Sequence, residues 1–121
     1  MALGPVGQIH ISVTDLDRSV GFYRDVLGIP LLFVVPEQPM AFFASGDVRL
    51  YLGVPESEEF RSKTVIYFHV EDIDAEQERL AALGVAFRDK PHVVHRDASG
   101  ELWMSAFNDP DGHHLVLMQQ R

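Results

Sequence analysis

The feature that most constrains the fold of this chain is an internal repeat. Val13–Asp17 (VTDLD) is matched by Val70–Asp74 (VEDID), and Leu27-Gly28 is matched by Leu83-Gly84 with one residue deleted between the motifs. Self-similarity on this scale indicates two copies of one supersecondary unit. A sheet with a helix on one face needs cover for its other face, so neither copy buries its sheet alone. We therefore predict a single domain over residues 1–121, with repeat one at about 7–54, a linker at 55–62 and repeat two at about 63–119.

The first repeat has the pattern of a strand, a helix and three strands. Residues 8–13 alternate between apolar and polar side chains, which is typical of a half-buried strand. Asp15 or Asp17 can cap the helix that follows, and Gly28 suits its end. Three β-prone runs separated by turn residues come next, at Leu31–Val35, Met40–Ala44 and Val48–Val54.

The second repeat returns in the same order. A strand is predicted over 64–70, followed by a helix that begins after Asp72 and ends at Gly84. Further strands are predicted at Val85–Phe87, near His92–His95, at Leu102–Phe107 and at Leu115–Met118. The predicted fold class is α+β, with two βαβββ repeats that form a paired mixed sheet around a cleft.

Composition excludes several classes of function. The chain has no cysteine, so disulfides and zinc–thiolate sites are impossible. Its formal net charge is −8 with no basic stripe, which argues against nucleic acid or an anionic membrane as partner. The apolar run Ile29–Val35 is too short to span a bilayer, and the first residues lack the apolar core of a signal peptide. We therefore expect a cytoplasmic protein.

Two motifs carry a family resemblance. Gln8–Gly28 (QIHISVTDLDRSVGFYRDVLG) resembles the opening of the vicinal oxygen chelate superfamily, which includes glyoxalase I, bleomycin-resistance proteins, fosfomycin-resistance enzymes and extradiol dioxygenases. Phe107–Gly112 (FNDPDG) resembles the signature turn before the last strand of that superfamily. The resemblance covers essentially the whole chain. It implies the paired βαβββ fold and a homodimer, and it leaves the activity open.

The resemblance also bears on metal binding. In metal-dependent members, four side chains from the first and fourth strands of the two repeats bind one divalent ion. Carried over by spacing, these positions are Gln8, Leu50, Val65 and Val116. Only Gln8 offers a ligand atom, and a divalent ion needs several. We therefore predict no metal and no other cofactor, as in the bleomycin-resistance branch.

Strand alternation predicts which side chains line the cleft. Gln8 and His10 share one face of the first strand, opposite Ile11, and Phe68 lies opposite Tyr67 on the corresponding strand. The same alternation places His92 and His95 on opposite faces of their strand. The predicted ligand-binding set is Gln8, His10, Leu50, Val65, Tyr67, His69, Trp103, Val116 and Met118.

The predicted function is binding of a small, partly apolar or aromatic molecule in the cleft, without metal. One alternative is a lyase, isomerase or dioxygenase relative with a non-standard metal site, for which His10, His69 and His114 are the available imidazoles. Another is a protein-interaction module with a vestigial cleft. The sequence names no ligand and no catalytic residue, so whether the protein is an enzyme stays open.

Overall fold

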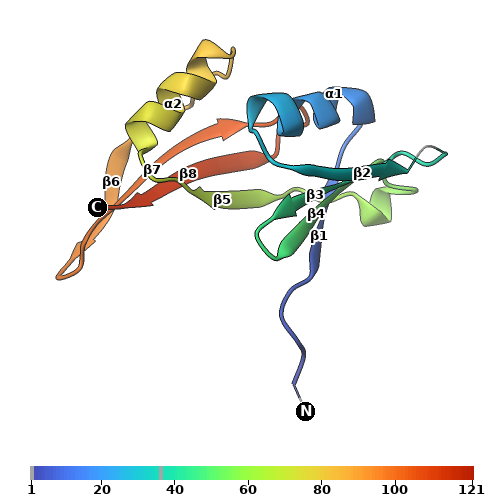
Figure 1. Cartoon of the computed structure of the whole chain (residues 1–121), viewed down its shortest axis with the longest axis horizontal. Coiled ribbons are helices and arrows are strands. Elements are labelled where there is room, and N and C mark those ends of the chain that lie inside the picture. Colours follow the sequence, from blue (N-terminus) through green and yellow to red (C-terminus); the bar gives the residue numbers. More distant parts are fainter. Residues whose placement is uncertain (1, 36) are drawn as a thin grey trace. The chain divides into compact units, whose positions relative to one another are not determined.

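The computed structural model describes residues 2–35 and 37–121, so that Met1 and Pro36 lie outside it. The chain divides into two compact units, one ending at Lys63 and the other formed by Thr64–Arg121. Each unit contains one of the repeats (Figure 1). In the part of the chain that the structure describes, no helix is both long and apolar enough to cross a membrane.

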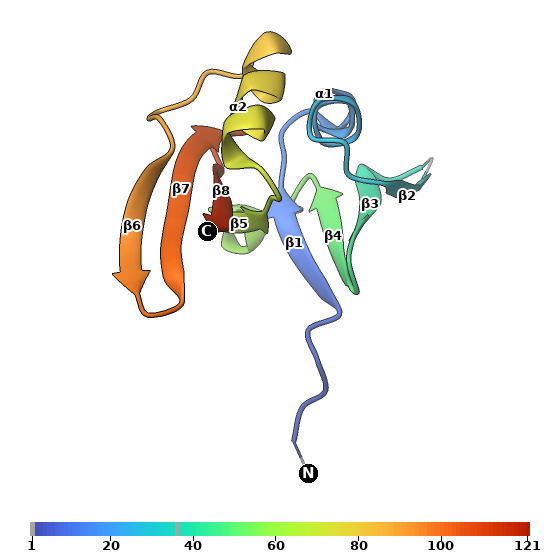
Figure 2. The ribbon, with the colours of Figure 1, turned by 60° about the vertical axis from the view of Figure 1, so that its left-hand side comes forward.

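The first unit is a four-stranded mixed sheet with helix on one face. Strand β1 pairs in parallel with β4, and the other neighbours are antiparallel, in the order β1-β4-β3-β2. Helix α1 packs on β3 and β4 (Figure 2). The elements in chain order are β1 (Gln8–Ser12), α1 (Leu16–Gly21), a π-helical turn η1 (Phe22–Val26), β2 (Leu31–Val35), β3 (Met40–Ser45), β4 (Val48–Gly53) and a 3₁₀ turn η2 (Glu58–Phe60).

The second unit repeats this topology. Its strand order is β5-β8-β7-β6, with β5 parallel to β8, and helix α2 packs on β7 and β8. Its elements are β5 (Val65–His69), α2 (Ile73–Ala82), β6 (His92–Asp97), β7 (Gly100–Asn108) and β8 (His114–Gln120). Two sheets of identical strand order confirm the α+β class and the βαβββ repeat.

The helix signals act as the sequence predicts. The Asp15 carboxylate accepts a hydrogen bond from the backbone N–H of Arg18 at 3.1 Å, so Asp15 rather than Asp17 caps the first helix. Asp72 caps the second by accepting from the N–H of Ala75 at 3.1 Å. Gly28 has φ of 77°, the left-handed conformation that closes a helix and that glycine adopts without a steric penalty.

The predicted strand at Val85–Phe87 is wrong. Of these residues only Phe87 pairs, through an isolated bridge to Phe107. A side chain takes the place of the backbone ladder directly after it, because the Asp89 carboxylate accepts from the backbone N–H of Ala106 at 2.8 Å. The second sheet therefore has four strands, like the first.

A shift of register occurs in the corresponding strand of each repeat, although not at equivalent residues. It lies between Leu31 and Phe33 in β2 and between Val93 and His95 in β6. Such a bulge changes which side chains share a face. His92 lies opposite Met104 and His95 lies opposite Leu102, two residues away on β7, so these histidines share a face. The prediction of opposite faces is wrong because simple alternation takes no account of the bulge.

Candidate functional site

The sheet face turned away from the helix in the first unit carries a row of four aromatic rings, one from each strand. His10 on β1 lies beside Tyr51 on β4, with ring centroids 4.7 Å apart. Tyr51 stacks on Phe42 of β3 at 5.0 Å, and Phe42 stacks on Phe33 of β2 at 4.7 Å. We call these four residues the aromatic row. The bulge in β2 shifts the register by one residue, so that Phe33 rather than Leu32 lies opposite Phe42.

Gly53 leaves space for the Tyr51 ring of the aromatic row. A Cβ atom at Gly53 would lie 2.7 Å from the ring of Tyr51, which is far closer than real atoms approach. The Tyr51 ring therefore lies over the backbone of Gly53, two residues along the same strand. This position is one where the absence of a side chain shapes the site.

Arg49 lies at the side of the row. Its guanidinium carbon is 5.0 Å from the ring centroid of Phe42 and 5.9 Å from that of Phe33, within the range of a cation–π contact. Its Nη2 donates to Oε1 of Gln8 at 3.0 Å. The amide oxygen of Gln8 is thus engaged by a cation.

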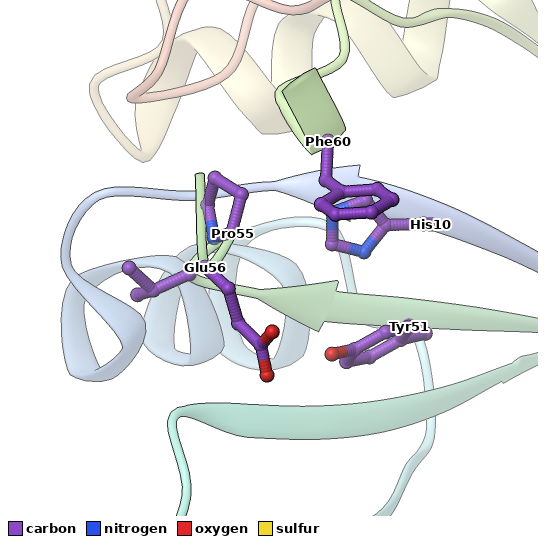
Figure 3. Close-up of a pocket in the computed structure, with 6 residues that line it drawn as sticks. His10, Tyr51, Pro55, Glu56 and Phe60 are labelled. Carbon is purple, nitrogen blue, oxygen red and sulfur yellow. The ribbon is translucent and has the colours of Figure 1, made fainter. Parts of the chain in front are cut away.

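A pocket of about 370 Å³ opens over His10 and Tyr51. Its other walls come from the segment after β4, namely Val54, Pro55, Glu56 and Phe60 (Figure 3). In this view the Glu56 carboxylate and the Tyr51 hydroxyl point toward one another. A mostly apolar, aromatic lining with a few polar groups is typical of a small-molecule site.

Hydrogen bonds hold this segment against the sheet. Oγ of Ser12 accepts from the backbone N–H of Ser62 at 2.8 Å, and the hydroxyl oxygens of Ser12 and Ser62 are 3.2 Å apart. Nε2 of His10 is hydrogen-bonded to the same Ser12 oxygen at 3.1 Å. Ser12 therefore bonds both to His10 at the floor of the pocket and to the segment that forms its wall.

Sequence reasoning missed this part of the site. It treated residues 55–62 as a linker, although the stretch contributes Pro55, Glu56 and Phe60 to the pocket. The available signal was Phe60, a large apolar residue in an otherwise polar and acidic run. Tyr51 was also missed.

The placement of Leu50 on the site face is wrong. Leu50 is a register neighbour of Ile9 on β1 and of Phe43 on β3, and it is only 3% exposed. Phe43 belongs to the helix side, since its ring centroid is 6.0 Å from that of Tyr23. The error is a slip of one residue, which moves a side chain to the other face of a sheet.

The same register also changes one of the four positions that the family resemblance implies for metal ligands. In the second unit Val65 pairs with His114, and Val116 follows two residues later on the same face. In the first unit Gln8 pairs with Arg49, so the residue equivalent to Val116 is Tyr51. The family's four ligand positions therefore correspond to Gln8, Tyr51, Val65 and Val116.

The second unit places most of its predicted site residues together. Val65, Tyr67 and His69 alternate onto one face of β5, and their register neighbours on β8 include Val116 and Met118. Val65 and Tyr67 are more than half exposed, whereas Val116 is buried. Their assignment to a ligand stays a prediction, as it does for Gln8 and His10 in the first unit.

Trp103 is an exception and lies on the other face. It pairs with Gln119, in alternation with the Met104–Met118 pair of the site face. Its indole N–H donates to Glu101 at 3.1 Å, and the guanidinium carbon of Arg121 is 4.5 Å from its ring centroid. The pKa of Glu101 is lowered first by its hydrogen bond from Arg96 and then by that from Trp103. Trp103 therefore belongs to a charged surface cluster rather than to the predicted site.

The histidines of the second unit do not gather at one point. His69 pairs with Met118 and His114 pairs with Val65, at opposite ends of β5, about 13 Å apart at the strand rise. Nδ1 of His114 is hydrogen-bonded to Nη1 of Arg88 at 2.9 Å. Within residues 2–35 and 37–121, no three His, Cys, Asp or Glu side chains form a group able to hold a metal ion.

Comparison with known proteins places this geometry in a family. The metallothiol transferase FosB of Staphylococcus haemolyticus is 36% identical over 126 residues, covering 93% of this chain and 81% of FosB. TnmS3, an antibiotic binding protein from Streptomyces sp. CB03234, superposes with a TM-score of 0.79 at 26% identity. The match covers 100% of this chain and 99% of the TnmS3 chain. A superfamily member from Sphaerobacter thermophilus DSM 20745 gives a TM-score of 0.81 at 24% identity over 98% of each chain. The model of one family matches residues 6–117, so the chain belongs to the Glyoxalase/Bleomycin resistance protein/Dioxygenase superfamily.

Proposed function

We propose that this protein binds a small aromatic molecule in the pocket over His10 and Tyr51, without a divalent metal ion. The observation that carries the proposal is the pocket itself, whose floor belongs to the aromatic row and whose wall includes Phe60. A flat ligand can stack on such rings and gain about 0.5–1.5 kcal/mol per aromatic pair beyond area burial. The similarity to an antibiotic binding protein supports a binding function.

The donor set argues against the metal chemistry that the name of the FosB relatives implies. Val65 and Val116 have no lone pair to offer, and Gln8 already accepts a hydrogen bond from Arg49. Tyr51 contributes at most one phenolic oxygen. Zinc sites use three or more N, O or S ligands from the protein, and Mg²⁺ is usually held by one or two carboxylates, which this set lacks. These residues do not fit the ion, so we do not propose a metal-dependent transferase, lyase or dioxygenase.

We expect protein purified without chelator to carry no stoichiometric zinc, nickel, iron or manganese. Elemental analysis of the dialysed protein measures this directly. Ordinary protein sites hold these ions tightly enough to survive purification. About one such ion per chain would contradict the metal-free proposal.

The charge of the pocket suggests which aromatic molecules bind. Glu56 supplies a carboxylate at the wall, and the whole chain carries a formal charge of −8. A cationic aromatic ligand is therefore favoured over an anionic one of the same shape. Two naphthalene probes test this, 1-naphthylmethylamine as the cation and 1-naphthoate as the anion, each titrated into ¹⁵N-labelled protein and followed by chemical shifts.

We expect the cation to bind more tightly by about threefold to tenfold, which corresponds to roughly 1 kcal/mol for one partly exposed charge pair. The shifts should centre on His10, Tyr51 and Phe60. Glu56→Gln keeps the shape of the wall and should remove most of the preference, whereas Glu37→Gln, which removes a charge outside the pocket, should leave it. Saturable binding whose shifts avoid His10 and Tyr51 would rule out this pocket.

We also propose that the protein forms a homodimer. Strand β2 (Leu31–Val35) is an edge strand made of apolar residues, and Leu32, Phe33 and Val34 are exposed. Unpaired apolar edges favour association with a second copy, and a two-fold axis closes them symmetrically. Sedimentation at micromolar concentration should show twice the chain mass, and a single species at 13.6 kDa would contradict the dimer.

A further inference from the structure

A row of soft metal ligands crosses the second sheet. His92 on β6 lies opposite Met104 on β7, and Met104 lies opposite Met118 on β8. Met118 in turn neighbours His69 on β5. Neighbouring strands are about 5 Å apart, so these four side chains stand next to one another along one line on one face. We call them the His–Met row.

The chemistry of the row differs from that of the family's divalent site. Thioether sulfur is a soft ligand that selects Cu(I) over hard or borderline divalent ions, and imidazole suits copper as well. The two methionines are partly exposed, and the two histidines are exposed. Two adjacent sulfurs with an imidazole beside them make a three-ligand set for one monovalent ion.

One histidine is already oriented for this role. Nδ1 of His92 is 2.8 Å from the backbone carbonyl oxygen of Lys90. A carbonyl can only accept, so Nδ1 carries the hydrogen, and in the neutral ring Nε2 keeps its lone pair. Histidines that bind metals commonly donate their other ring N–H to a carbonyl in this way, which fixes both tautomer and orientation.

The first repeat shows that the row is not a requirement of the fold. The corresponding line in the first sheet runs through Ser12, Gly53, Met40 and Val35. It contains one sulfur and no imidazole. The His–Met row is therefore specific to the second repeat, and Met40 provides an internal control at the position equivalent to Met104.

We propose that His92, Met104 and Met118 form a binding site for Cu(I), with Ag(I) as a non-redox substitute. The ion is held by the two methionine sulfurs and by Nε2 of His92. This site shares no residue with the aromatic pocket, and it needs none of the family's metal positions. Filling of an apolar surface by flexible methionines is the alternative that the experiment must exclude.

Methyl-¹³C-methionine labelling tests the site in the intact chain. The protein has four methionines, at positions 1, 40, 104 and 118, and each gives one methyl signal. Silver nitrate titrated in chloride-free buffer should shift the signals of Met104 and Met118 to saturation at one ion per chain, and that of Met40 should stay in place. Assignment follows from the single variants Met40→Leu, Met104→Leu and Met118→Leu.

Competition of Cu(I) with bathocuproine disulfonate under ascorbate gives the affinity. Met104→Leu, Met118→Leu and His92→Ala should each weaken binding by at least about tenfold, because even outer-shell changes at metal sites cost that much. Met40→Leu should change it by less than twofold. Stoichiometric binding unaffected by Met104→Leu and Met118→Leu, or no Ag(I) shift of either methyl group, would overturn the proposal.

Discussion

Replacing Phe43 by alanine is expected to lower the free energy of unfolding by about 3–5 kcal/mol, the range for removing a buried aromatic ring. Phe43 is fully buried and lies between the sheet and the helical segment, with its ring 6.0 Å from that of Tyr23. Loss of the ring leaves a cavity that packed neighbours fill only in part. Urea unfolding followed by circular dichroism measures the change.

The matched control is Phe33→Ala. Phe33 is the same residue type on the neighbouring strand β2, but its side chain is 46% exposed and lies on the opposite face. We expect it to cost clearly less stability than Phe43→Ala, because less apolar surface leaves water at this position when the chain folds. Similar losses at both positions would contradict the assignment of the two faces.

If the chain is one domain, as its sequence predicts, Phe43→Ala should also shift the unfolding of the second repeat in a single transition.

The second large effect separates two neighbours on β4. Tyr51→Ala removes a ring that floors the pocket and stacks on Phe42, and it should weaken binding of 1-naphthylmethylamine by about tenfold or more. Leu50→Ala should instead cost about 2–5 kcal/mol of stability, since Leu50 is 3% exposed on the helix side. Binding by the folded Leu50→Ala protein should stay within about twofold of the parent.

This pair of variants tests the strand register directly. A shift of one residue would exchange the two phenotypes, so that Leu50→Ala lost binding and Tyr51→Ala lost mainly stability. Binding is measured below the melting temperature of each variant, with folding checked by circular dichroism. The outcome therefore tests the assignment of Tyr51 as the site residue of β4.

The proposed pocket also has a consequence for ligand design. Phe60 is 62% exposed, although it walls the pocket over His10. A bound aromatic molecule can cover part of this ring, because apolar surface that leaves water stabilises the complex. The acidic segment that carries Phe60 thus supplies both the apolar cover and, through Glu56, the charge.

Local chemistry was enough to predict the repeats. Capping aspartates at positions 15 and 72, and glycines at 28 and 84, set the helix limits through short-range hydrogen bonds and backbone sterics. Alternation along residues 65–69 likewise placed Tyr67 and His69 on one face and Phe68 on the other. These features depend on neighbours in sequence, which the sequence displays directly.

The sequence by itself determined two βαβββ units, because the strand and helix patterns follow from residue type and spacing. Tertiary structure alone decided which residue of β4 faces the site, since the parallel register of β1 and β4 selects Tyr51 over Leu50. It also decided that residues 54–60 wall a pocket, through the hydrogen bonds of Ser62 to Ser12. Contacts between residues fifty positions apart produce no periodic pattern in a sequence. A bulge, in turn, moves the residues after it to the face opposite the one that simple alternation predicts.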